Sequence, residues 1–425
     1  MFVLLFLLSI QISFQLIIPL NTFNNIPNIT STIKQSILLQ KITVNIPLLS
    51  TCFGTPKDCF NMALETTYFN TFLDGTGEYF NKCFNKEKSD TFNSTNETLF
   101  FNYQNKKLKG NVGLDKIMIK QYQIEDISNE KFGFILLEEN NTSIDKILVD
   151  GIIGLKKNDP QTNNSQLSFL HFFHIKSNFS FDLTKDKKNN YLRGNFLLDE
   201  NKDNNINYSI CKSSNNFNQT TNITDDEWKC NIINISIGIG SNTPIPINTF
   251  AYFSVINPLI EFPYEIGFFI LYRLYEQSEG ECEIIKEENI SIFVCNEKIT
   301  DISKFEKIYL YYNNNTNPIL LNPKNYFEKA NGKYICKIVQ NNNIKNIILG
   351  IPAFLDNTFI FDIKQNEIKI KENKENYTAY IIIIGIIGLI LIVIPMIIFI
   401  YEYNKNEKNF RKLDINNTNN LIEKN

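Results

Sequence analysis

The feature that most constrains the fold is a β-rich pattern between residues 40 and 371. Short apolar or alternating runs, typical of strands, are separated by clusters of Asn, Gly, Asp and Lys, which are typical of turns. Six such runs are KITVNIPLL, GFILLEE, SFDLTKD, NIINISIGIG, EKIYLYY and TFIFDI. One helix is expected over residues 165–175, SQLSFLHFFHI, where apolar residues recur at helical spacing. The pattern predicts a mainly β (all-β) protein.

Both ends of the chain carry apolar segments. Residues 379–401, AYIIIIGIIGLILIVIPMIIFIY, contain no charged residue and are long enough for a transmembrane helix. Residues 1–19 open with an apolar run of the length of a secretory signal peptide. We therefore expect a single-pass type I membrane protein of the secretory pathway, at the cell surface or in an endosomal or vacuolar membrane. Residues 20–39 would be a short spacer, and residues 402–425 a cytosolic tail.

The cysteines, the sequons and the net charge indicate the cellular compartment and the class of partner. All eight cysteines lie between the two apolar segments, which suits an oxidising compartment, and eight cysteines allow 105 pairings. Sequons of the Asn-x-Ser/Thr type are compatible with a glycoprotein. They include Asn28, Asn93, Asn96, Asn178, Asn234, Asn289 and Asn376. The formal net charge of −3 indicates no basic face, so nucleic acid is not an expected partner.

Seven local signatures follow one another in the order found in pepsin-like aspartic proteases. They are FGTPKDCFNMALETTYFNTFL, KEKSDTF, FNYQNKKLKGNVGLDKIMI, DGIIGL, FSFDL with WKCNIINISIG, FAYFSVINPLIEFP, and NIILGIPAFLDNTFIFDIKQNEIKI. Each signature alone is weak evidence for the family, but the seven together cover nearly the whole region between the apolar ends. The chain therefore resembles this family.

The resemblance implies a bilobal fold of two β-barrel-like lobes, residues 40–200 and 201–371, with a peptide-binding cleft between them and a hairpin flap over it. Ile152-Ile153-Gly154 and Ile348-Leu349-Gly350 fall at the elements that support the two catalytic turns in the family, and Tyr103 falls at the flap tyrosine. The resemblance also implies a disulfide between Cys295 and Cys336. A pair of Cys211 and Cys230 could close the loop between the lobes.

The residues at the two catalytic turns differ from the Asp-Thr-Gly that the family chemistry requires. Two carboxylates close enough to share one proton activate a water between them. The first turn reads Glu65-Thr66-Thr67, which keeps a carboxylate but extends it by one methylene, and misplacement by about 1 Å can lower the rate roughly a hundredfold. The second turn reads Ser254-Val255-Ile256 and has no carboxylate. We interpret the catalytic pair as dismantled.

Three functions remain open on this sequence. The first is a membrane-anchored pseudoprotease that binds an extended peptide or protein in the cleft, with Tyr103 and Thr66 as peptide-binding residues. The second is an active aspartic-type endopeptidase in which Glu65 works with a water or another acid. The third is a surface or scaffold protein whose cleft has no ligand. No cofactor or metal is expected under any of the three.

Two other motifs resemble functional sites. Asp74-Gly75-Thr76-Gly77 looks like a displaced catalytic turn, but Gly-Thr-Gly after Asp is ordinary turn chemistry, and we predict a turn. His171 and His174 are spaced to share a metal on a helix, but no third ligand is evident. We therefore predict two surface histidines.

Overall fold

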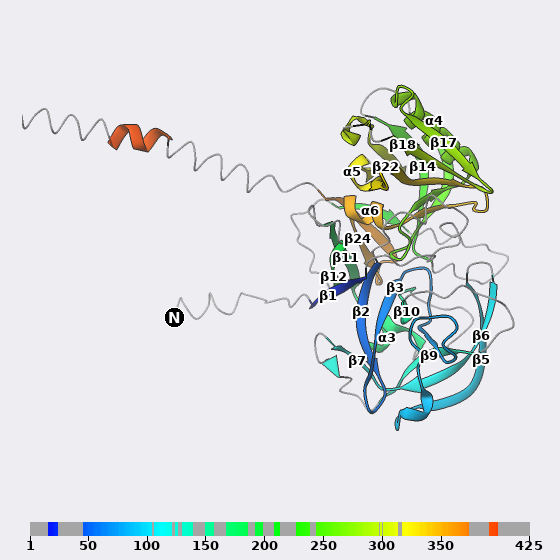
Figure 1. Ribbon diagram of the computed structural model, residues 1–425. Helices are drawn as coiled ribbons and strands as arrows, with labels where there is room; N and C mark the ends of the chain where they lie inside the picture. The colour runs from blue at the N-terminus through cyan, green and yellow to red at the C-terminus, as the bar shows by residue number, and fades with distance from the viewer. Residues whose placement is uncertain are drawn as a thin grey trace, which may run out of the picture. The chain divides into compact units, whose positions relative to one another are not determined.

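A computed structural model describes residues 16–23, 46–103, 106–120, 124–125, 130–138, 149–156, 167–185, 192–198, 208–212, 227–238, 244–296, 298–299, 301–312, 317–373 and 391–397. The chain divides into two compact units, residues 1–373 and 374–425. In the first unit strands predominate (Figure 1), as the sequence predicted.

The strands are β1 (Leu16–Phe23), β2 (Ile46–Phe53), β3 (Asp58–Glu65), β4 (Phe72–Asp74), β5 (Asn93–Tyr103), β6 (Lys106–Asp115), β7 (Ile117–Ile119), β8 (Ile124–Glu125), β9 (Phe132–Leu137), β10 (Gly151–Gly154), β11 (Asn178–Lys185), β12 (Leu192–Leu198), β13 (Ser209–Lys212), β14 (Lys229–Ile237), β15 (Ile245–Phe253), β16 (Ile260–Phe262), β17 (Cys282–Glu287), β18 (Ile290–Cys295), β19 (Ile308–Tyr312), β20 (Ile319–Leu321), β21 (Phe327–Ala330), β22 (Lys333–Asn341), β23 (Ile347–Leu349), β24 (Asn357–Asp362) and β25 (Glu367–Glu372). The helices are η2 (Lys86–Lys88), α3 (Phe169–Phe172), α4 (Tyr264–Gln277), η5 (Ile302–Lys304), α5 (Pro323–Tyr326) and α6 (Ile351–Asp356).

The strands form two sheets. The first runs in the order β13-β25-β24-β11-β12-β1-β2-β3-β10-β4-β9-β6-β5, with β7 beside β2 and β8 beside β7. The second runs in the order β17-β18-β22-β16-β23-β15-β14-β19-β20, with β21 beside β22. In the first sheet β24 pairs with β11, so strands from beyond residue 200 complete a sheet that begins with the N-terminal strands (Figure 1).

Strand β1 begins within the expected signal peptide. Its residues 16–20 pair with β12, and its last three residues pair with β2. The backbone of residues 16–19 is therefore part of the first sheet. Residues 1–15, the rest of the expected signal peptide, lie outside the described part of the chain.

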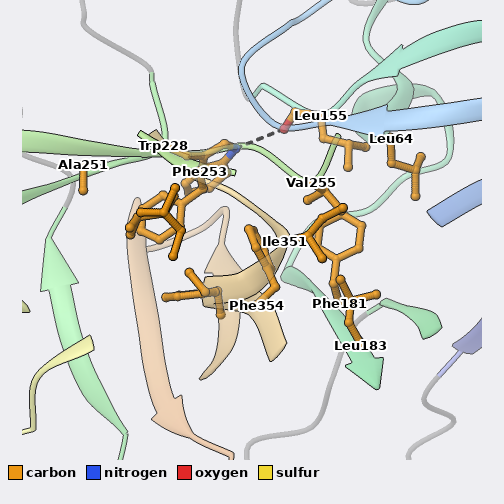
Figure 2. Packing of buried hydrophobic residues seen from close by; sticks show 14 of the residues in the cluster. Leu64, Leu155, Phe181, Leu183, Trp228, Ala251, Phe253, Val255, Ile351 and Phe354 are labelled. Atoms are coloured by element: carbon orange, nitrogen blue, oxygen red, sulfur yellow. Dashed lines mark hydrogen bonds between the residues drawn. The ribbon is translucent and has the colours of Figure 1, made fainter. Parts of the chain in front are cut away.

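One buried cluster joins elements that are far apart in the sequence. Trp228, the only tryptophan of the chain, is 2% exposed and donates its indole N–H to the carbonyl oxygen of Leu155 at 3.0 Å (Figure 2). Phe253 and Val255 from the second sheet, and Phe181 from the first, are buried in the same cluster. Of these residues, Phe253 ends β15 and Val255 belongs to the turn that follows it.

Three disulfides are present: Cys52–Cys59, Cys211–Cys230 and Cys282–Cys295. The Cys211–Cys230 pair is confirmed, but the expected Cys295–Cys336 pair is wrong. The reason is the strand register, because Cys282 on β17 lies directly opposite Cys295 on β18, with their Cα atoms 4.0 Å apart. On its other side Cys295 lies opposite Tyr334, and Cys336 remains a buried thiol outside any disulfide.

The helices differ from expectation at several points. Of the predicted helix at 165–175, only α3 is helical among its described residues, starting after the N-cap Ser168. The longest described helix, α4, was not predicted, although it buries Ile270, Leu271 and Leu274 against the second sheet. Within the described residues no helix has the length and apolar character needed to cross a membrane. Residues 391–397 of the predicted span are helical, and the rest of it lies outside the described part of the chain.

Candidate functional site

The first turn follows β3, which ends at Glu65. Strand β10 runs parallel to β3, with Gly154 paired to Glu65, and the next N–H, of Leu155, donates to the carbonyl oxygen of Glu65 at 2.8 Å. A Cβ atom on Gly154 would lie 2.5 Å from the carbonyl oxygen of Tyr68, closer than packing permits. Only glycine lets the support strand approach the turn this closely.

The second turn is built in the same way after β15, which ends at Phe253. Strand β23 runs parallel to β15, and the N–H of Ser254 donates to the carbonyl oxygen of Leu349 at 3.0 Å. A Cβ atom on Gly350 would lie 2.0 Å from the carbonyl oxygen of Leu259 and 2.2 Å from that of Asn257. The segments 152–154 and 348–350 therefore do support the two turns, as the resemblance implied.

The two turns bring Glu65 and Ser254 together. The Ser254 hydroxyl donates to Oε2 of Glu65 at 2.8 Å, across 189 residues of sequence. The other carboxylate oxygen, Oε1, accepts from the N–H of Thr67 at 3.0 Å and from its hydroxyl at 2.9 Å. Glu65 is 1% exposed and Ser254 is 7% exposed. The site is thus a carboxyl–hydroxyl pair, in which both carboxyl oxygens accept hydrogen bonds from the chain.

Burial controls the electrostatics of this pair. Desolvation raises the pKa of Glu65 above its usual value, and the hydrogen bonds from Ser254 and Thr67 and from the Ile256 backbone lower it by less. Desolvation also raises the pKa of Tyr68, with a further rise from the charge of Glu65. Among the described residues, the hydrogen-bond partner of Glu65 across the two turns is the hydroxyl of Ser254 and not a second carboxylate. The described pair therefore has one titratable carboxyl group and one neutral hydroxyl.

A hydrogen bond from the first turn to the second connects them, and the second turn lacks the matching hydroxyl. Thr66, 1% exposed, donates its hydroxyl to the carbonyl oxygen of Phe253. The corresponding residue of the second turn, Val255, is buried and has no hydroxyl to return the bond. Thr66 was expected to bind peptide, but its hydroxyl is used between the turns, and a contact of Thr66 with a ligand stays a prediction.

Sequence reasoning missed the role of Thr67. Thr67 is β-branched and stands at the position that is glycine in the Asp-Thr-Gly turn. Neither Thr67 nor Ile256 has a positive φ angle, so neither turn requires glycine at this position. Thr67 instead donates two hydrogen bonds to Glu65, one from its N–H and one from its hydroxyl. A hydroxyl two residues after a carboxylate is a common local turn pattern, and it could have signalled this contact.

The second turn has a further polar support that the sequence did not reveal. Glu261 is 3% exposed, and its two carboxylate oxygens accept from the side-chain amides of Asn257 at 2.8 Å and Asn341 at 2.7 Å. The Asn257 side-chain oxygen in turn accepts from the N–H of Leu259 at 3.0 Å. This network fixes the loop that Gly350 contacts, since Asn257 and Leu259 both belong to it.

The expected flap is a hairpin of β5 and β6, in which Tyr103 pairs with Lys106. The side chain of Tyr103 lies outside the described part of the structure. A contact between Tyr103 and a ligand over the Glu65–Ser254 pair therefore stays a prediction.

The two competing motifs are structural. Asp74 is fully buried and accepts from the N–H groups of Thr76, Gly77, Tyr79 and Phe80, so it organises a turn, as predicted. His171 and His174 are both exposed. Among the residues that the structure describes, no group of three His, Cys, Asp or Glu side chains could hold a metal ion.

One comparison with known proteins finds a similarity that covers the first turn of the site. Residues 53–240 match the sequence profile described as "Eukaryotic aspartyl protease", which includes the first turn with Glu65 and the flap hairpin. No curated protein matches the chain. The second turn, with Ser254, lies beyond the matched region. Residues 53–240 are therefore similar to the eukaryotic aspartyl protease family.

Proposed function

We propose that this chain is a pseudoprotease: it binds an extended peptide or protein segment in a pepsin-like cleft without hydrolysing it. One observation carries the proposal. The Ser254 hydroxyl donates to Glu65 from the place where the mechanism needs a second carboxylate. A pair of carboxyl groups shares a proton because two like charges cannot both ionise at close range. A serine hydroxyl does not titrate in this range, so the pair cannot alternate between acid and base.

The remaining contacts of Glu65 support the same conclusion. Its Oε1 accepts two hydrogen bonds from Thr67, and its Oε2 accepts one from Ser254. A carboxylate that activates water must accept a hydrogen bond from that water. The described contacts leave Glu65 few acceptor positions for it. In this proposal the Glu65–Ser254 pair is a structural bridge between the two turns.

The parts that bind peptide in such a fold depend on backbone geometry, which this chain retains. Both turns keep their glycine-supported strands, and β5 and β6 form the flap hairpin. A strand-like ligand is recognised mainly through its main-chain hydrogen bonds, and these do not require a second carboxylate. Binding can therefore persist where catalysis is lost.

A second candidate is an unconventional endopeptidase, and the raised pKa of Glu65 favours it. Burial keeps this carboxyl protonated to a higher pH than an exposed glutamate, as a general acid requires. An acid alone does not supply a base for the attacking water, so we rank this candidate second.

We further propose that the protein passes through the secretory pathway and is anchored by residues 379–401. The three disulfides support an oxidising compartment. The uncharged apolar stretch at 379–401 supports a single membrane span, with the tail at 402–425 in the cytosol. A protease-protection assay on intact vesicles tests the topology, since it should shield the body and expose the tail.

Binding and turnover measured on the same samples test the functional proposal. The purified full chain is incubated with a mixed peptide library between pH 3 and 8. We expect retained peptides and no turnover above that of Glu65→Ala. Ser254→Asp alone should stay inactive, because Val255 still cannot return the hydrogen bond between the turns. A Ser254→Ala variant is the control for loss of the bridge without added charge.

Two results would refute the proposal in different ways. Turnover by the unmutated chain that Glu65→Ala abolishes would make this protein an enzyme. Absence of both binding and turnover, in protein with intact disulfides, would favour a surface or scaffold protein whose cleft has no ligand.

A further inference from the structure

We propose that Asn289 and the Asn93–Asn96 segment of the flap strand are N-glycosylation sites, and that Asn178 is not, although all four begin a sequon. The acceptor motif Asn-x-Ser/Thr occurs at each of them, so sequence alone does not separate them. The structure separates them by burial and by the position of each asparagine in its strand.

Asn289 stands in the two-residue connection between β17 and β18, whose last and first residues, Glu287 and Ile290, pair with each other. The preceding residue, Glu288, has a φ of 47°, which makes the reversal tight, and Asn289 is exposed. The backbone carbonyl of Asn289 accepts from the N–H of Asn342 at 2.9 Å, which fixes the main chain but does not use the side chain. An asparagine at the tip of an anchored turn presents its amide to solvent and has room for a bulky saccharide.

The flap strand offers a second acceptor region. Asn93 and Asn96 are both exposed on β5. The pairing of β5 with β6 is irregular between Ser94 and Thr98, and Asn96 within this irregularity has a φ of 59°. A bulged residue is left out of the ladder, so a substituent on Asn96 would not disrupt the pairing of β5 with β6.

Asn178 is the contrasting case in the same chain. It is 5% exposed, it opens β11, and its Cα pairs with that of Asp362 on β24. A saccharide on Asn178 would have to displace the packed neighbours of β11, so chains that carry one would not complete the first sheet.

The modification is a group transfer from a lipid-pyrophosphate-linked oligosaccharide. The side-chain nitrogen of asparagine forms a bond to the anomeric carbon of the first sugar and loses a proton. The bond from that carbon to the phosphate oxygen breaks, and the lipid pyrophosphate leaves. No oxidation or reduction occurs. At Asn289 the sequon hydroxyl, on Ser291, is only 6% exposed after folding, so the transfer must precede formation of the β17–β18 hairpin.

The inference rests on the secretory route proposed above, and the experiment separates the two. The full chain is produced in eukaryotic cells with an intact secretory pathway and purified in its folded form. An amidase that converts glycosylated Asn to Asp is applied in heavy-oxygen water, and each sequon peptide is then scored by mass spectrometry. We expect the label at Asn289 and at Asn93 or Asn96, and none at Asn178. Asn289→Gln should remove one glycan step on a gel, whereas Ser291→Thr, which preserves the sequon, should retain it.

The unfavourable outcomes are distinct. Label at other sequons but not at Asn289 or the flap pair would overturn the site assignment while supporting secretory passage. Label at Asn178 in folded protein would overturn the argument from burial. No label at any sequon would overturn both the assignment and the secretory route, and it would leave the peptide-binding proposal to its own test.

Discussion

Replacement of Asp356 by asparagine should remove a large part of the pH dependence of stability. Asp356 ends α6, the helix that follows Gly350, and is 5% exposed. Its carboxylate oxygens accept from the N–H of Asn322 and from the Asn325 side chain, each at 2.7 Å. Burial raises its pKa from 3.8 to about 7, against smaller lowering by these bonds and by the charges of Lys324 and Lys307.

The sign and size of the effect follow from linkage. Because the folded state has the higher pKa, it holds the proton of Asp356 over a pH range in which the unfolded chain has released it. The resulting stabilisation is complete below the unfolded pKa of 3.8 and is lost as the pH rises through about 7. For these two pKa values it amounts to about 2.7 kcal/mol at pH 5 and almost nothing at pH 8. The unmutated protein should thus be more stable at the lower pH.

Urea unfolding at pH 5 and pH 8, followed by the fluorescence of the buried Trp228, measures this difference. Asp356→Asn keeps the shape of the side chain but cannot titrate, so its loss of stability between the two pH values should be smaller by about 2.6 kcal/mol. Asp301→Asn is the control, because hydrogen bonds from Ser303 lower the pKa of Asp301 and keep it ionised throughout this range. Equal pH dependence in Asp356→Asn and the unmutated chain would refute the reasoning.

Two further predictions concern backbone packing and the thiols. Gly350→Ala should destabilise the fold by about 3 kcal/mol, because its Cβ would meet two backbone carbonyl oxygens. Gly280→Ala is the control: a Cβ there has open space but the residue has a φ of 86°, so the cost should be about 1 kcal/mol. Similar unfolding midpoints for the two variants would contradict this prediction. Alkylation of the native protein at pH 8 should modify the exposed Cys83 but spare Cys336, since burial raises the pKa of the Cys336 thiol to about 12. Peptide mapping then identifies the modified cysteines. Modification of Cys282 or Cys295 would disprove the disulfide between them.

The sequence by itself determined the local parts of this protein. Alternating apolar runs predicted the strands because side chains on a strand alternate between its faces. The Gly154 and Gly350 segments could be located because their short sequences resemble the elements that support the turns in the aspartic protease family. Asp74 was assigned to a turn for the same reason, since Asp, Gly and Thr bond to their own backbone over a few residues.

Only the tertiary structure decided the contacts between distant segments. Cys282, and not Cys336, pairs with Cys295 because the register of β17 against β18 sets their separation, and a register cannot be read from cysteine spacing. Glu65 and Ser254 are 189 positions apart, and the hydrogen bond between them exists because folding brings the two turns into contact. The loss of a carboxylate was visible in the sequence. That the remaining carboxyl is buried and held by neutral hydroxyls depends on how the two halves pack, since burial and hydrogen bonding are properties of the folded chain.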